Sequence, residues 1–261
     1  MNHESTLPKK QKGLLIGIIV SMILFQFVIS PLLGTSKDSE MISNSVLRML
    51  GGSGFIILLL GFGYRKIFHF KHAGQALIIM IPAFLISLNN FPIIAFLGGR
   101  AQLIDPIYRV ILFFIECLSV GFFEEIIFRG LLLMLLIERL STKKHGIWIA
   151  VISSSILFGM IHLINLINGA SLSGTLLQVI YSTLMGMLWA VMYLHTKNLW
   201  LTMVLHATYN FFGQVMFYLG TVNNRFDTYT VSITIILGCL VAVYAFITLK
   251  EVIERQNMTT S

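Results

Sequence analysis

Two adjacent glutamates and a nearby arginine interrupt a long apolar stretch of this chain. Glu124 and Glu125 are followed by Arg129, inside a mostly apolar run from about Ile107 to Ile137. A charge in hydrocarbon costs at least about 2.5–3.5 kcal/mol. Such groups must therefore be paired, hydrated or both, and an ionisable side chain in a membrane segment indicates a functional site.

The spacing of these charges divides them into two roles. On a helix, Glu125 and Arg129 are four residues apart and share a face, so they can form an ion pair. Glu124 points about 100° away from that face. We therefore expect Glu125 and Arg129 to form a structural pair, while Glu124 is free for proton transfer. We expect Glu116, on the same helix, to be snorkelling or hydrogen-bonded, without a role in the chemistry.

Two further polar pairs occur later in the chain, each with the same four-residue spacing. Phe158 precedes His162, which places an apolar wall beside a titratable nitrogen. His206 precedes Asn210, which aims two hydrogen-bond donors into one space. Counted from the expected helix ends at about 1.5 Å per residue, these groups and Glu124 lie at similar depths. The sequence thus predicts that one carboxylate, two imidazoles and an amide meet near mid-membrane.

The composition is that of a membrane protein. Of the 261 residues, 56% are hydrophobic and 11% are charged, against about 25% charged residues in a soluble domain. The net charge of +7 does not indicate nucleic-acid binding, because Lys and Arg gather on the cytoplasmic loops of membrane proteins. We expect one membrane domain over residues 1–261. Cys117 and Cys239 lack metal-ligand spacing and are expected to be small core residues.

The fold expected is an all-α polytopic bundle, since about 20 apolar residues cross a bilayer. Asn89, Asn90 and Pro92 should kink the third span or make it re-entrant. Asp105 and Pro106 should begin the fourth span, which is long enough to bend, for example near Gly121. Eight spans meet the length criterion, at approximately 13–34, 46–64, 74–98, 107–137, 147–167, 175–195, 198–219 and 231–249.

The basic residues predict the orientation. With a cytoplasmic N-terminus, twelve of the eighteen Lys and Arg residues fall on inner segments, five on outer segments and Arg129 in the membrane. Cytoplasmic loops carry the excess of Lys and Arg. We therefore expect both termini to be cytoplasmic. The outer five are Lys37, Arg48, Arg100, Arg109 and Arg225.

The three motifs together resemble those of the CPBP family, which comprises the CAAX proteases and bacteriocin-processing proteins, also called the Abi group. They are Glu124-Glu125-x-x-x-Arg129, Phe158-x-x-x-His162 and His206-x-x-x-Asn210. The resemblance covers roughly residues 120–212, and the protease-like core is expected at about 105–220.

The resemblance implies an intramembrane endopeptidase of the glutamate type. Glu124 would act with His162 to deprotonate a water that attacks the scissile carbonyl. His206 and Asn210 would donate hydrogen bonds to the resulting oxyanion. Glu125, Arg129 and Phe158 would shape the site.

The motifs also suggest the cofactor requirement, the partners and the cellular role. We expect no metal, with zinc held by Glu124, His162 and His206 as the alternative. The expected partners are the lipid bilayer and a membrane-associated peptide or protein substrate, in a multi-pass protein of a bacterial plasma membrane. The resemblance implies maturation of a peptide signal or self-immunity to a bacteriocin. Two other functions remain open: a non-catalytic scaffold or immunity protein of the same fold, and a small proton-coupled transporter.

Overall fold

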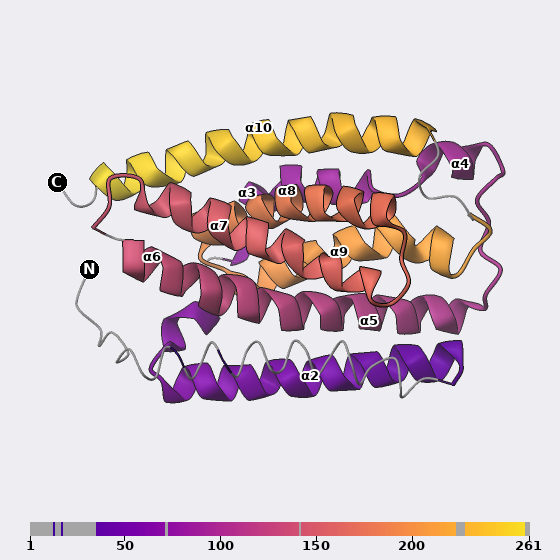
Figure 1. The fold of residues 1–261 in the computed structure, drawn as a ribbon, viewed down its shortest axis with the longest axis horizontal. Helices are drawn as coiled ribbons and strands as arrows, with labels where there is room; N and C mark the ends of the chain where they lie inside the picture. The colour runs from indigo at the N-terminus through magenta and orange to yellow at the C-terminus, as the bar shows by residue number, and fades with distance from the viewer. Residues whose placement is uncertain are drawn as a thin grey trace.

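The computed structural model describes residues 13, 17, 35–70, 73–140, 142–222 and 228–258, and these residues form a bundle of helices without a named strand. The helices lie along one long axis (Figure 1), which confirms the all-α fold. In chain order they are α2 (Lys37–Gly61), η1 (Arg65–Phe68), α3 (Ala73–Leu88), α4 (Ile93–Leu97), α5 (Ile107–Glu125), η2 (Ile126–Leu133), α6 (Met134–Leu140), α7 (Gly146–Met160), η3 (Ile161–Leu166), α8 (Leu172–Thr196), α9 (Leu199–Tyr218) and α10 (Thr228–Met258).

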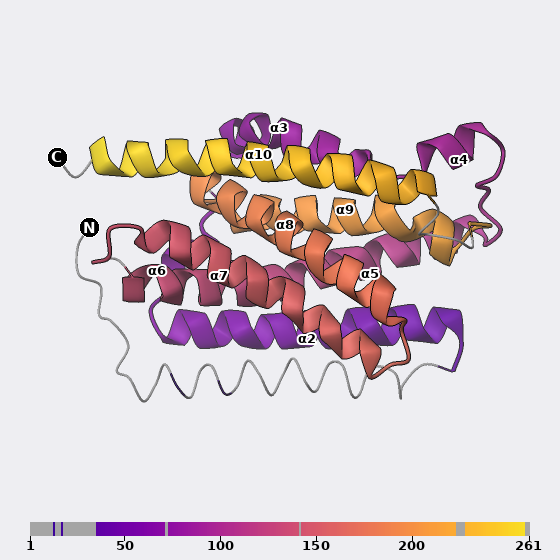
Figure 2. The same ribbon diagram turned by 45° about the horizontal axis from the view of Figure 1, so that its top comes forward.

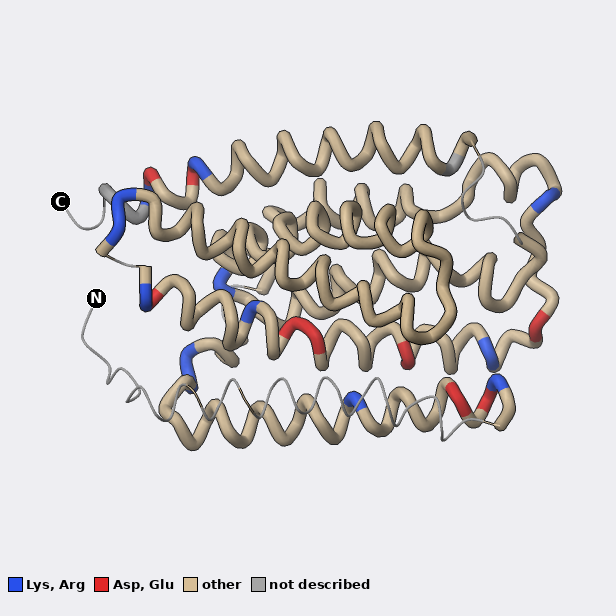
Figure 3. Tube along the Cα trace, in the orientation of Figure 1, with Lys and Arg blue, Asp and Glu red and all other residues tan. Residues whose placement is uncertain are grey.

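The bundle has two ends, which we name by a residue at each. At the Asp105 end, α2 and α5 begin and α9 stops; at the Lys144 end, α6 turns into α7 and α10 stops (Figure 1). Most charged residues lie near these two ends, and few lie along the middle of the rods (Figure 3). This distribution is what a bilayer around the middle of the bundle requires.

Seven of the eight expected spans correspond to helices. The first, 13–34, lies almost wholly outside the described residues. Within the part of the chain that the structure describes, four helices are long and apolar enough to cross a membrane: Lys37–Gly61, Gly146–Leu166, Leu172–Thr196 and Val231–Arg255. Ala73–Leu88 is a shorter apolar helix. The protein is thus a multi-pass membrane protein, and the count of eight stays a prediction.

The polar interruption of the third span is a true break. The helix α3 ends at Leu88, and α4 begins only at Ile93. Between them, the side-chain amide of Asn90 donates to the backbone oxygen of Tyr209 on α9, 2.9 Å away. The segment between α3 and α4 is therefore hydrogen-bonded to α9.

Local sequence explains where several helices begin. Ser36 caps α2 by accepting a hydrogen bond from the backbone of Ser39, and Asn198 caps α9 in the same way through Leu201. A side-chain oxygen in this position satisfies a backbone donor that the helix leaves free. The expected cap of the fourth span is wrong: Pro106 is the cap residue of α5, without a side-chain hydrogen bond, and Asp105 pairs with Lys37 and Arg109.

The long rod formed by α5, η2 and α6 does not break at Gly121, where a bend was expected. The helix α5 continues to Glu125, and a π-helical segment, η2, follows it. At Gly121 the rod crosses α9 so closely that an added Cβ would lie 2.5 Å from the backbone oxygen of Met203. This glycine therefore permits helix packing, and the irregular geometry lies further along the rod.

The main hydrophobic core takes buried side chains from most of the helices, among them Phe55 of α2, Met80 of α3 and Val151 of α7. The helix α8 crosses between α10 and α7 (Figure 2), and it is more buried than α10. Cys117 is buried as expected, whereas Cys239 on α10 is exposed, so the expectation of a core residue was wrong there. Its helix faces outward, where a membrane protein presents apolar side chains to lipid.

Candidate active site

The two glutamates of α5 occupy different environments. The side chain of Glu125 has no exposed surface, whereas 24% of that of Glu124 is exposed. The residues also differ in direction: Glu124 lines a cavity, and Glu125 contacts buried groups. The two carboxylates point in different directions, as their angular separation predicted, and their separate roles stay a prediction.

Glu125 and Arg129 form the expected ion pair. One guanidinium nitrogen of Arg129 lies 2.8 Å from the Glu125 carboxylate, and another donates to the backbone oxygen of Gly186 at 2.9 Å. The guanidinium also lies 4.6 Å from the ring of Phe158 and 5.3 Å from that of Trp189. A buried charge needs such hydrogen bonds and aromatic faces, because it has lost its hydration.

The π-helical segment begins directly after this pair of glutamates. It covers Ile126–Leu133 and carries Arg129 in its first turn. A π turn places one extra residue in the turn, and such irregularities are frequent at functional sites. Nothing in the apolar residues of this segment distinguishes it from an ordinary helix, so sequence reasoning missed it.

His206 lies between the two glutamates. Its Nδ1 is 2.8 Å from Oε1 of Glu125, and its Nε2 is 3.7 Å from Oε2 of Glu124. The bond to the buried carboxylate fixes the orientation of the ring and leaves Nε2 on the side of Glu124. Glu125 thus has a second partner that the sequence did not reveal, and it acts as more than a counter-ion for Arg129.

Trp189 stacks on one face of the His206 ring. The two rings stack with centroids 3.8 Å apart and an angle of 19° between their planes. Trp189 is buried on α8. A single tryptophan in an apolar helix normally signals packing, so the sequence offered no sign of this contact.

His162 reaches the same region from α7. Its Nδ1 lies 3.1 Å from the backbone oxygen of Phe158, the acceptor one turn earlier, which leaves Nε2 without a partner among the described residues. The ring of Phe158 packs edge-on against both His162 and His206. Phe158 is therefore an apolar wall beside His162, as its position in the motif predicted, and it also contacts His206.

All the residues expected to take part in the chemistry line one cavity. It has a volume of about 340 Å³ and lies between α2, α5, α7, α8 and α9. Its lining includes Glu124, His162, His206 and Asn210. These four side chains come from three separate stretches of the chain and line the same cavity, while their catalytic roles stay predictions.

Glu116 also lines this cavity, closer to the Asp105 end. Its carboxylate accepts a hydrogen bond from Asn44 at 2.8 Å and pairs with Arg48 at 3.2 Å. The hydrogen-bonded state expected for Glu116 is confirmed. Arg48, counted above with the outer charges, lies within α2 and faces the cavity.

The described residues contain no cluster of three or more His, Cys, Asp and Glu side chains placed to hold a metal ion. Glu124 and His206 approach each other, and Glu125 bonds to the opposite nitrogen of the same ring. The His206 ring thus has a carboxylate on the side of each of its nitrogen atoms.

The fold and the cavity define a class: a helical membrane protein with a cavity inside the bundle that is lined by carboxylates and imidazoles. The comparison with protein families agrees, because residues 106–212 match the family described as type II CAAX prenyl endopeptidase Rce1-like. The resemblance seen in the three motifs is thereby confirmed, and at the level of the family it supports an intramembrane endopeptidase. No curated protein matches the chain.

Proposed function

We propose that this protein is a glutamate-type intramembrane endopeptidase that hydrolyses a peptide bond in a membrane-associated peptide or protein. The observation that carries the proposal is the placement of Glu124. It is the partly exposed carboxylate of the pair, it faces the cavity, and His162 and His206 line that same cavity.

In the proposed reaction a water molecule binds between Glu124 and His162. Glu124 takes a proton from this water as its oxygen attacks the carbonyl carbon of the substrate. The tetrahedral oxyanion accepts hydrogen bonds from the side-chain amide of Asn210 and from protonated Nε2 of His206. Glu124 then returns its proton to the leaving amine as the carbon–nitrogen bond breaks. His206 donates from Nε2 as the imidazolium, which carries a proton on each ring nitrogen, because its Nδ1 proton is donated to the Glu125 carboxylate.

The test is the substitution Glu124→Gln in purified full-length protein, assayed on a quenched membrane peptide. The amide keeps the shape of the side chain but cannot accept the proton. We expect unchanged folding and a loss of cleavage of about a hundredfold or more, as for other positioned bases. Glu251→Gln, on the exposed surface of α10, is the control and should cleave like the parent. Cleavage by Glu124→Gln at the parental rate would refute the assigned base.

The proposal also covers the metal requirement, the domain organisation and the cellular location of the protein. The reaction requires no metal, so cleavage should persist after treatment with a strong chelator; activity that disappears and returns with added zinc would instead favour Glu124, His162 and His206 as ligands. We propose a single membrane domain, with residues 105–220 as its protease core. Both termini would be cytoplasmic in a bacterial plasma membrane, where the protein would mature a peptide signal or protect against a bacteriocin.

A further inference from the structure

The cavity is asymmetric along the bundle axis. On α2 its lining residues are Glu40 and Arg48, both in the first half of the helix, and on α5 they end at Glu124. On α9 they run from His206 to Tyr218, the last residue of the helix. The cavity thus extends from the middle of the bundle toward the Asp105 end.

The opposite side of Glu124 is packed. Immediately after the glutamates, Ile126 and Ile127 are buried, and so are Leu131 and Leu133 one to two turns further on. Leu199, at the start of α9, is also fully buried. These side chains belong to the main hydrophobic core, which separates Glu124 from the Lys144 end. The cavity lining does not include these apolar side chains.

The route toward the Asp105 end is polar. Glu116 lies eight residues before Glu124 on α5, which is roughly 12 Å closer to that end. It pairs there with Arg48 and accepts a hydrogen bond from Asn44. Gln214 lines the cavity from α9. Charged and amide groups along a membrane cavity indicate a hydrated path.

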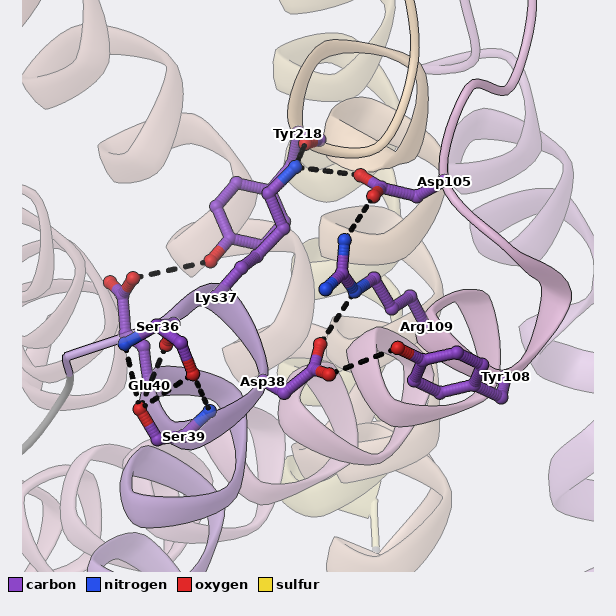
Figure 4. Close-up of polar contacts among 9 residues, drawn as sticks. All are labelled: Ser36, Lys37, Asp38, Ser39, Glu40, Asp105, Tyr108, Arg109 and Tyr218. Carbon is purple, nitrogen blue, oxygen red and sulfur yellow. Dashed lines mark hydrogen bonds and ion pairs between the residues drawn. The ribbon is translucent and has the colours of Figure 1, made fainter.

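The outer edge of the cavity lies at the Asp105 end of the bundle. Glu40 and Tyr218 line the cavity there, and the Tyr218 hydroxyl donates to Glu40 at 3.4 Å (Figure 4). Beside them, Lys37 pairs with Asp105 at 2.6 Å and donates to the backbone oxygen of Tyr218. The start of α2 is therefore fixed to α5 and α9 around the opening.

We propose that water and substrate reach Glu124 from the Asp105 end of the bundle, through the passage lined by Glu116, Arg48 and Gln214. This inference rests on the proposed function for the identity of the substrate. In the orientation expected from the Lys and Arg residues, the Asp105 end is extracytoplasmic. The substrate is then a peptide whose scissile segment lies on that face, and a translocation reaction must supply it before cleavage.

Cysteine accessibility tests the direction of access without requiring cleavage. Cys117 and Cys239 are first replaced by alanine in the full-length protein. Val120→Cys then places a thiol on the cavity wall one turn from Glu124, and Leu131→Cys places one in the packed core below it. Arg100→Cys and Lys144→Cys mark the two ends. A membrane-impermeant methanethiosulfonate is added to sealed vesicles of each orientation, and modification is measured by mass.

We expect Val120→Cys to be modified from the side that modifies Arg100→Cys, and to be untouched from the side that modifies Lys144→Cys. Leu131→Cys should remain unmodified from both sides. Modification of Val120→Cys from the Lys144 side would overturn the proposal. So would a lack of reaction from both sides, because the passage would then be closed to water.

A second measurement uses the unaltered protein and does not depend on the variants folding. An impermeant quenched peptide is added to one side of proteoliposomes of known orientation. We expect cleavage of peptide added at the Asp105 end and a complete loss of cleavage when it is added at the Lys144 end. Cleavage from the Lys144 end refutes the direction alone, whereas parental activity in Glu124→Gln refutes the catalytic proposal alone.

Discussion

Glu125 has two neighbours of different chemistry, and its contacts with both depend on its charge. Its carboxylate pairs with Arg129, orients His206 and lies beyond the reach of solvent. We expect Glu125→Gln to lower stability by roughly 3–5 kcal/mol, because removing one partner of a buried pair leaves the other charge uncompensated. Thermal unfolding of the purified variant, compared with Glu124→Gln, measures this. A fully stable but inactive Glu125→Gln would show that this carboxylate takes part in the chemistry.

Residue types and spacing sufficed to predict which side chains gather at the site. The four-residue intervals in the three motifs placed Glu124, His162, His206 and Asn210 on faces that meet at one cavity. The contacts of Trp189 could not be predicted in this way, since they depend on how α8 is rotated against α9. Rotation of one helix about its axis is set by tertiary packing, which periodicity within a single helix does not encode.

The close crossing of α5 and α9 at Gly121 can be tested by substitution. Gly121→Ala should destabilise the protein by about 1–3 kcal/mol, since the new methyl group collides with the backbone of α9 and one helix must shift. Gly54→Ala is the matched control: its helix has nothing within 4 Å of the added atom. It should gain up to about 1 kcal/mol from helix propensity. Chemical denaturation of both variants compares them, and equal stability would contradict the close crossing.

The extents of the helices were predictable where sequence signals were strong. The Asn89, Asn90 and Pro92 interruption correctly marked the break between α3 and α4. The long rod was predicted as a helix, but its irregular part was assigned to Gly121 and found at Ile126–Leu133. A glycine signals backbone freedom in a sequence, whereas here it accommodates a neighbouring helix. Arg129, within the π segment, bonds to Gly186 on α8, a contact that the local sequence does not reveal.

The ion pairs at the Asp105 end should make the thermal stability of the whole protein depend on pH. Lys37 and Arg109 hold the pKa of Asp105 below its ordinary value by hydrogen bonding to its carboxylate. A carboxylate with a lowered pKa stabilises the folded state above the ordinary pKa, about 3.9, and loses that contribution as the pH falls through the folded value. The melting temperature should therefore drop below about pH 4 more steeply in the parent than in Asp105→Asn. Parallel curves for the two proteins would show that the network carries no such linkage.

The pairing of Glu125 with Arg129 has a consequence for how the protein is made. Both residues lie on one helix, so they can neutralise each other as soon as that helix forms. The other partners arrive later: Gly186 follows Arg129 by 57 residues, and His206 follows Glu125 by 81. When this segment leaves the ribosome and enters the lipid, the helices α8 and α9 that carry these partners have not yet been synthesised. The arginine therefore brings its counter-ion into the bilayer with it, and the early insertion step does not depend on the final fold.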